Sequence, residues 1–131
     1  MKYLCIVYAE DRTFDALSES ELAALDESSL ANDEELRRNG HLIVAQALQP
    51  VATATTVRLR NGRMSATDGP FAETTEQLAG FVFIEARDLN EAIEIAGRMP
   101  MAKVGSIEVR PVLDLVQKVQ DRRAMKEPPL P

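Results

Sequence analysis

The stretch Gly80-Phe-Val-Phe-Ile-Glu-Ala86 decides the fold, because its aromatic and β-branched residues predict a β-strand. In an extended chain, Phe81 and Phe83 point to one face of the sheet. Val82 and Ile84 point to the other face. A strand that is apolar on both faces must be shielded from water on both sides, so this strand is expected in the middle of a covered sheet.

Other strands are predicted on either side of this stretch. Tyr3–Tyr8 is also apolar on both faces. The dipeptide Asn61-Gly62 is a strong hairpin signal. The remaining predicted strands are Leu42–Leu48, the two hairpin strands Thr53–Arg60 and Arg63–Thr67, and Ser106–Arg110.

A long helix is predicted between the first two strands. Ser18 and Glu21 have the spacing of a capping box, and Gly40 is expected just after the helix ends. Its apolar stripe consists of Leu22, Leu25 and Leu36, and it also contains Ser29 and Asn32. These two polar residues are read either as tolerated at the helix edge or as facing a wet cavity.

A second helix follows the central strand. Asp88 and Glu91 again have capping-box spacing, and Gly97 and Pro100 are expected to end the helix. Its expected buried stripe is Leu89, Ala92, Ile93 and Ala96.

The element order is β, α, β, hairpin, β, α, β, which predicts an α+β two-layer sandwich with a mainly antiparallel sheet and two helices on one face. Two helices cannot cover both faces of the two apolar strands. Burying one large apolar side chain is worth roughly 1.5–3 kcal/mol, so an exposed row would be costly. The sequence therefore predicts a homodimer with twofold symmetry that packs sheet face against sheet face.

Composition limits the classes of partner. The chain has 131 residues and a net charge of −6, which disfavours binding to a nucleic-acid backbone. From Glu19 to Glu35 there are seven acids and no base, which indicates a solvated helix face or, alternatively, an acidic docking patch.

The cysteine count and the lengths of the apolar runs bear on location. Cys5 is the only cysteine, so no intrachain disulfide can form, and it is read as a small buried hydrophobic residue. No apolar run reaches the roughly 18 residues of a membrane span. We expect a cytoplasmic protein.

The chain is divided into an α+β domain at residues 1–113 and an extension at residues 114–131. Leu115–Met125 is predicted to be a short helix, and the proline-rich tail 127–131 favours polyproline II. The extension is read as a frayed tail, as an arm around the partner subunit or as a proline-motif ligand.

Motifs for established chemistry are absent. The sequence contains no P-loop, no GxGxxG, no CxxC and no GxSxG. With one histidine and one cysteine, we expect no metal site and no cofactor. His41 is read as a surface or helix-end imidazole.

The segment Asp68–Gln77 is the one candidate for a functional loop. In the structural reading, Asp68 caps the turn with its side chain, Gly69-Pro70 stiffens the backbone and Phe71 anchors the loop in the core. In the functional reading, the same stiff turn holds the Asp68 carboxylate at the mouth of a cavity, as a general base or a ligand contact.

Several motifs resemble the YCII-related, or DGPF-domain, proteins. They are Met1–Tyr8, Gln49-Pro50 with Ala52–Arg58, Asp68–Phe81 and Gly105–Pro111. The resemblance covers about residues 1–113. It implies a ferredoxin-like dimeric α+β barrel with a cavity between sheet and helices, and a bacterial setting in which relatives accompany extracytoplasmic-function sigma factors.

The resemblance also bears on catalysis. A His–Asp pair has been proposed for relatives, and its aspartate corresponds to Asp68. The histidine is expected on the first helix, where this chain has Ser29 and Asn32 instead. Thr75 stands where the DGPF pattern commonly has lysine.

Two functions follow. The first is a binder or enzyme for a small molecule in a cavity near Asp68, with enzymatic activity left open. Phe71 would wall that cavity, and the other candidate ligand contacts are Tyr8, Gln46, Glu73 and Arg110. The alternative is a non-catalytic interaction or regulatory module, linked to sigma-factor signalling, that uses the acidic helix or the proline tail.

Overall fold

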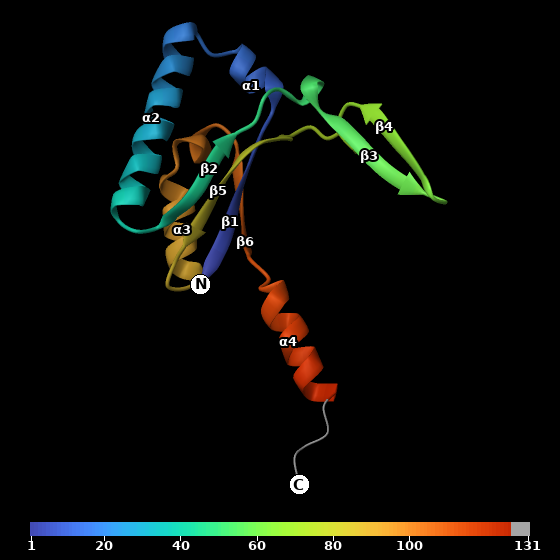
Figure 1. Ribbon diagram of the computed structural model, residues 1–131. Helices are drawn as coiled ribbons and strands as arrows, with labels where there is room; N and C mark the ends of the chain where they lie inside the picture. The colour runs from blue at the N-terminus through green and yellow to red at the C-terminus, as the bar shows by residue number, and fades with distance from the viewer. Residues whose placement is uncertain (127–131) are drawn as a thin grey trace.

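The computed structural model describes residues 1–126 and has at its centre a four-stranded sheet in the order β2-β5-β1-β6 (Figure 1). Every neighbouring pair in this sheet is antiparallel. The α+β class and the mainly antiparallel sheet are therefore confirmed. The strands are β1 (Lys2–Ala9), β2 (Leu42–Ala47), β5 (Gln77–Glu85) and β6 (Ser106–Pro111).

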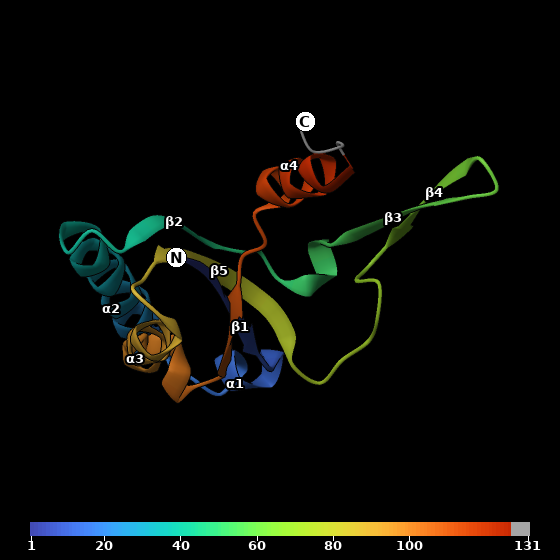
Figure 2. The ribbon, with the colours of Figure 1, turned by 90° about the horizontal axis from the view of Figure 1, so that it is seen from below.

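Two helices cover one face of this sheet, as expected. They are α2 (Glu19–Arg38) and α3 (Leu89–Arg98), and Figure 2 shows both on the same side. Three short elements in the connections were not predicted: α1 (Asp11–Asp15), η1 (Val51–Thr53) and η2 (Pro100–Lys103).

The core lies between the sheet and these helices. Tyr3 and Cys5 of β1 and Ile84 of β5 are fully buried there, and Leu36 packs over them from α2. Tyr3 is directly opposite Ile84 in the ladder. The odd-numbered positions of β1 thus form the core face, as the two-residue period of a strand requires.

The predicted caps are present. Ser18 accepts a hydrogen bond from the backbone N–H of Glu21, and the Glu21 carboxylate accepts one from the backbone of Ser18. At the start of α3, the Asp88 carboxylate accepts from the backbone of Glu91. Glu91 itself accepts from the backbone of Arg87, one residue before the expected partner.

The predicted stripe of α3 was partly wrong. Ala92 and Ala96 are buried, but Ile95 and Met99 complete the buried face. Leu89 and Ile93 are instead exposed; they lie along the neighbouring helical stripe and face a groove beside β6. Apolar residues occupy two adjacent stripes of this helix, and the sequence period alone does not say which one meets the sheet.

The hairpin forms where Asn61-Gly62 predicted it. Its strands β3 (Thr55–Arg60) and β4 (Arg63–Asp68) pair only with each other and form a second sheet. Asn61 and Gly62 both have positive φ angles, 52° and 74°, which match a type I′ turn. The hairpin projects from the side of the main sheet opposite α2 and α3 (Figure 2).

The predicted C-terminal helix is present as α4 (Leu115–Lys126), and it extends away from the sheet (Figure 1). The predicted polyproline segment 127–131 lies outside the described residues. The division of the chain at residue 113 stays a prediction. None of the helices between residues 1 and 126 is long and apolar enough to cross a membrane.

Candidate functional site

The face of the main sheet that α2 and α3 leave uncovered is called the open face. The ladder places Leu4 of β1 between Phe83 of β5 and Arg110 of β6 on this face. Ile6 lies between Phe81 and Glu108 in the same way. The open face comprises Leu4, Ile6, Tyr8, Val44, Gln46, Phe81, Phe83, Ser106, Glu108 and Arg110.

A groove at one end of the open face is the best candidate site, and we call it the Tyr8 groove. It is open to solvent and has a volume of about 570 Å³. The loop before β5 forms one wall, and there the Ser106 hydroxyl donates to Glu76 Oε1 over 3.1 Å. The groove is lined by Tyr8, Thr74, Thr75, Glu76, Ser106, Ile107 and Glu108.

The polar groups of the Tyr8 groove are mainly hydroxyls and carboxylates. Glu108 is paired with Arg110, the next residue of β6 on the same face. Glu108 Oε2 is shielded from water, and the guanidinium group of Arg110 contacts this oxygen. The other carboxylate oxygen of Glu108 can accept a hydrogen bond from a ligand that brings an O–H or N–H group.

Asp68 lies at the end of β4, opposite Thr55, and does not hold its own turn. The turn is closed by the Gly69 N–H, which donates to Ala54 O over 2.7 Å, and by the Thr56 hydroxyl, which donates to Gly69 O over 2.8 Å. Within the described chain the Asp68 carboxylate makes no hydrogen bond or ion pair. The predicted side-chain cap was therefore wrong, because main-chain groups and the Thr56 hydroxyl make the hydrogen bonds that close the turn.

Phe71 was also expected to anchor the loop in the core, and this was wrong. Its side chain is 78% exposed. The loop from Gly69 to Glu76 runs outside the main sheet, and the contact it makes at Phe71 is through the carbonyl oxygen, which accepts from Arg58 over 3.4 Å. A core position would require the loop to cross the sheet.

The structure divides the six predicted site residues into two groups. Tyr8, Gln46 and Arg110 lie on the open face, and Tyr8 is the member that lines the groove. Asp68, Phe71 and Glu73 lie at the base of the hairpin and in the loop that follows, all exposed.

Glu76 belongs to the predicted functional loop Asp68–Gln77 but was not named as a contact, and sequence reasoning missed Ser106 and Glu108. The two-residue period of β6 already placed Glu108 on the same face as Arg110. The pairing of β6 with β1, which brings them to Tyr8, could not be read from that period.

His41 lies far from this groove, at the other end of the main sheet. Its Nδ1 is 2.9 Å from Glu85 O, and Glu85 pairs with Lys2 at the start of β1. Tyr8 is six residues further along the same strand, about 20 Å at roughly 3.3 Å per residue. His41 cannot therefore exchange a proton with the Tyr8 groove of its own chain.

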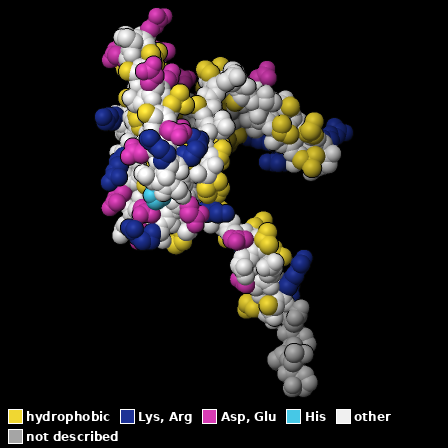
Figure 3. Space-filling model, turned by 60° about the vertical axis from the view of Figure 1, so that its left-hand side comes forward, with side chains coloured by type: hydrophobic (Ala, Val, Ile, Leu, Met, Phe, Trp, Pro, Cys, Tyr) yellow, Lys and Arg dark blue, Asp and Glu magenta, His cyan; other side chains and the backbone are white. Residues whose placement is uncertain are grey.

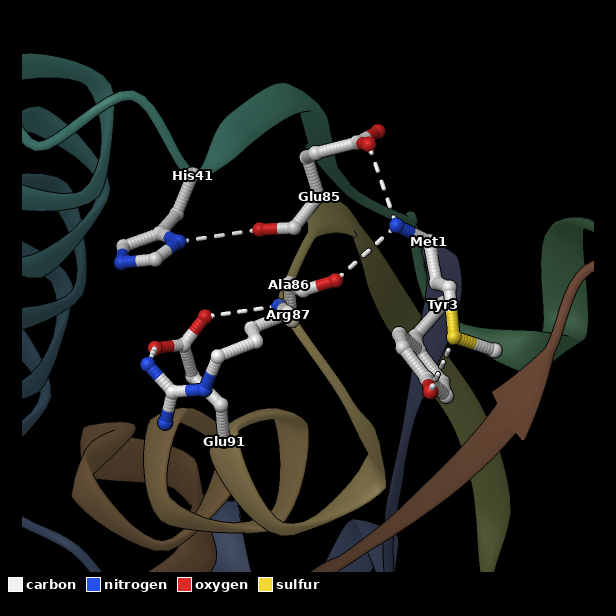
Figure 4. A network of polar contacts seen from close by, with 7 residues as sticks. All are labelled: Met1, Tyr3, His41, Glu85, Ala86, Arg87 and Glu91. Carbon is white, nitrogen blue, oxygen red and sulfur yellow. Dashed lines mark hydrogen bonds and ion pairs between the residues drawn. The ribbon is translucent and has the colours of Figure 1, made fainter.

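The network around His41 is structural. Figure 4 shows the Met1 amino group donating to Glu85 Oε1 and to Ala86 O, at 3.1 and 3.0 Å. Ser29 and Asn32 share the half-buried side of α2 with Leu36, as predicted. They therefore lie on the helix-covered side of the sheet and not on the open face. In the described chain no group of three or more His, Cys, Asp or Glu side chains is placed to hold a metal ion.

A second groove, of about 610 Å³, lies between α3 and β6 on the helix side of the sheet. Leu89, Ile93, Ile107 and Val109 line it, with small residues between them and no ionisable side chain. It lacks the polar groups that orient a small molecule, so the Tyr8 groove is the better candidate.

The sheet order β2-β5-β1-β6, with two helices on one face, defines a ferredoxin-like α+β protein. The YCII-related domain family matches residues 1–116, and the chain belongs to this family. An uncharacterized protein of Rhizobium meliloti (strain 1021) is 34% identical over 114 residues, which cover 86% of this chain and 92% of that protein. The family resemblance is thus confirmed.

The fold is also seen in a solved enzyme structure. It is a 5-chloro-2-hydroxyhydroquinone dehydrochlorinase from Burkholderia phenoliruptrix AC1100, in complex with 2,5-dihydroxybenzoquinone. The TM-score is 0.54, and the match covers 86% of this chain and 94% of that chain. With 13% sequence identity, the likeness concerns the fold alone.

Proposed function

We propose that this protein binds, and transforms, a small molecule in the Tyr8 groove, and that it does so as a homodimer. The observation that carries the proposal is the groove itself, where the open face meets a loop bearing hydroxyl and carboxylate groups. Glu76 and Glu108 supply acceptors, Tyr8 and Ser106 supply hydroxyls, and Ile107 supplies an apolar wall. This set suits a neutral, hydroxyl-bearing ring compound.

The fold neighbour supports this class of ligand. It is described as acting on a chlorinated hydroxyhydroquinone and was solved with a dihydroxybenzoquinone. The hydroxyl groups of a neutral hydroquinone can donate hydrogen bonds to Glu76 and Glu108. An ionised dihydroxyquinone would be repelled by the same two carboxylates, and Arg110 already pairs with one of them.

Asp68 is the proposed proton acceptor. Its carboxylate has no partner within the described chain, and the turn that carries it is held by other groups. Asp68 does not line the Tyr8 groove of its own chain, so in this proposal it would act on a ligand held by the second subunit of the homodimer. No histidine is within reach of the Tyr8 groove, so a His–Asp pair within one chain is not part of this proposal.

The homodimer follows from the open face. Leu4, Ile6, Phe81 and Phe83 form a continuous apolar strip there, without a covering helix among the described elements. A surface of this kind on a small domain marks an interface. Two copies related by a twofold axis would cover each other's strips and enclose the grooves beside them.

A titration with hydroquinone tests the ligand class, with 2,5-dihydroxybenzoquinone as the charged comparison and amide chemical shifts as the readout. We expect hydroquinone to shift Tyr8, Ser106 and Glu108. Glu108→Gln should weaken binding about tenfold, as the loss of a charged hydrogen bond does. Glu94→Gln, an exposed change on α3, should have no effect. Equal binding to all three proteins, or shifts only in the groove between α3 and β6, would contradict the proposal.

The role of Asp68 is tested by Asp68→Asn. We expect the free energy of unfolding to stay within about 0.5 kcal/mol of the original, because the carboxylate holds no turn. The response to hydroquinone or its conversion should fall. A variant that unfolds would make Asp68 a structural residue and remove the reason for proposing catalysis.

A second candidate function is an interaction or regulatory module. The observation that favours it is the acidic outer surface of α2, where Glu19, Asp26 and Glu27 are all exposed. It predicts no ligand-induced shift at the Tyr8 groove and binding of a basic protein segment to α2.

A further inference from the structure

The β3–β4 hairpin, called the arm (Thr55–Asp68), has two chemically different faces. In its ladder Val57 is opposite Ala66 and Leu59 is opposite Met64, so these four side chains share one face, the apolar face of the arm. Arg58, Arg60, Arg63 and Ser65 lie on the other face.

The apolar face of the arm is bare in a single chain. Val57 is 61% exposed, Leu59 65% and Met64 73%. Figure 3 shows hydrophobic side chains along the projecting hairpin and on α4. An isolated two-stranded hairpin is at best marginally stable in water, and a packed apolar face is what normally stabilises it. The arm thus has the apolar composition of a buried element, but no other part of the described chain covers its apolar face.

The charge of the arm points to the partner. The arm has three arginines and one acid, Asp68 at its base. The whole chain has 15 basic and 21 acidic residues, so 12 basic and 20 acidic residues lie outside the arm, an excess of eight acids. A second copy of this chain therefore offers the arm a surface of opposite charge.

The position of the arm points the same way. The arm and α4 both project from the side of the main sheet opposite α2 and α3, which is the side of the open face (Figures 1 and 2). A subunit that covers the open face must lie within reach of both projections. In a twofold dimer each arm would extend along the other subunit.

We propose that the arm is a dimerisation arm, whose apolar face packs against the second copy of the chain while its arginines approach that copy's acidic surface. This inference rests on the homodimer proposed above and adds the segment that reaches across. In this arrangement the base of the arm, which carries Asp68, lies against the partner subunit.

Two matched variants test the inference by sedimentation equilibrium of the full chain. Leu59→Asp and Ser65→Asp each add one negative charge to the arm, on the apolar and the polar face respectively. We expect Leu59→Asp to raise the dimer dissociation constant about tenfold or more, and Ser65→Asp to change it by less than about threefold. Both side chains are exposed in the single chain, so a free arm would tolerate the two changes equally.

Cross-linking gives a second readout that does not depend on either variant folding. Met64→p-benzoylphenylalanine is prepared in ¹⁴N and ¹⁵N forms, and the forms are mixed before irradiation. We expect mixed-isotope cross-links, which arise only between two copies. If the dimer is stable and both variants have equal dissociation constants, the arm does not contribute to dimerisation. Cross-links only within one chain would mean the same. Either result contradicts the dimerisation arm but is compatible with a dimer formed by the sheet faces. A monomer at all concentrations, or cross-links only to another protein, overturns both.

Discussion

The thiol of Cys5 lies in the centre of β1 and has no exposed surface. Burial raises the pKa of this thiol to about 11, because an apolar environment disfavours the thiolate. We expect Ellman's reagent to label it only at the rate of unfolding, because the reagent cannot reach the buried thiol in the folded chain. Rapid labelling of the native protein at a rate independent of stability would show that β1 is accessible.

Asp33 offers a pH-dependent test. Partial burial raises the pKa of its carboxyl group, and the positive charge of the nearby Arg37 lowers this pKa by a smaller amount. A raised pKa means that the charged form is less favourable in the folded than in the unfolded chain, so the penalty exists at neutral pH and vanishes below the ordinary aspartate range.

Asp33→Asn should therefore raise the free energy of unfolding at pH 7, on the order of 0.5 kcal/mol. The gain should disappear near pH 3, where the aspartate is protonated in both states. Urea denaturation at the two pH values measures this. A gain that is equal at both values would show that the amide packs better, with no contribution from charge.

At the scale of the elements, the approach of β6 to β1 determines the shape of the Tyr8 groove. Gly105 precedes β6, and a methyl group on its α-carbon would overlap the Tyr8 carbonyl oxygen. This oxygen is a backbone atom, so it can move only if the strand moves. Gly105→Ala should therefore cost roughly 1–3 kcal/mol of unfolding free energy and displace Ser106.

The matched control is Gly97→Ala in α3. A methyl group there meets no atom within 4 Å. This helix should become more stable by roughly 0.5–1 kcal/mol, because alanine is the better helix former. Urea denaturation of both variants should thus give changes of opposite sign. A neutral Gly105→Ala would mean that β6 can shift along β1 without cost.

The elements themselves could be predicted because their signals are local. Ser18 with Glu21 marks the start of α2, and Asn61-Gly62 marks the hairpin, whatever the rest of the chain does. The Tyr8 groove could not be predicted in the same way. It depends on a pairing between β1 and β6, about 100 residues apart, which no local period reveals.

The predicted positions of Phe71 and Asp68 were wrong for a related reason. An aromatic residue after a stiff turn is typical of a core anchor, and an aspartate before glycine is typical of a side-chain cap. In the structure the turn lies at the base of a projecting hairpin, outside the main sheet. Local chemistry predicts the turn, but only tertiary structure decides whether the turn meets the core.

At the scale of the whole molecule, the open face should control the oligomeric state. Val44 lies on it, opposite Phe83, and is 39% exposed in the single chain. Val44→Asp would place a charge in the proposed interface and should raise the dimer dissociation constant about tenfold or more.

Ile93→Asp is the comparison for this change. Ile93 is 51% exposed on α3, on the other side of the sheet, so the same charge there should leave the dissociation constant unchanged. Sedimentation equilibrium of both variants measures the difference. If Ile93→Asp dissociates the dimer and Val44→Asp does not, the subunits meet through their helices.

The two outer strands of the main sheet differ in how well they resist unwanted pairing. β6 ends at a proline and carries Glu108 and Arg110. β2 has no charged residue, and Ile43 and Val44 are both exposed along it. An uncharged outer strand is a template on which a foreign strand can add, the first step towards fibrils. The register shift between Leu42 and Val44 interrupts this template, so we expect the irregularity at Ile43 to hinder the addition of a foreign strand.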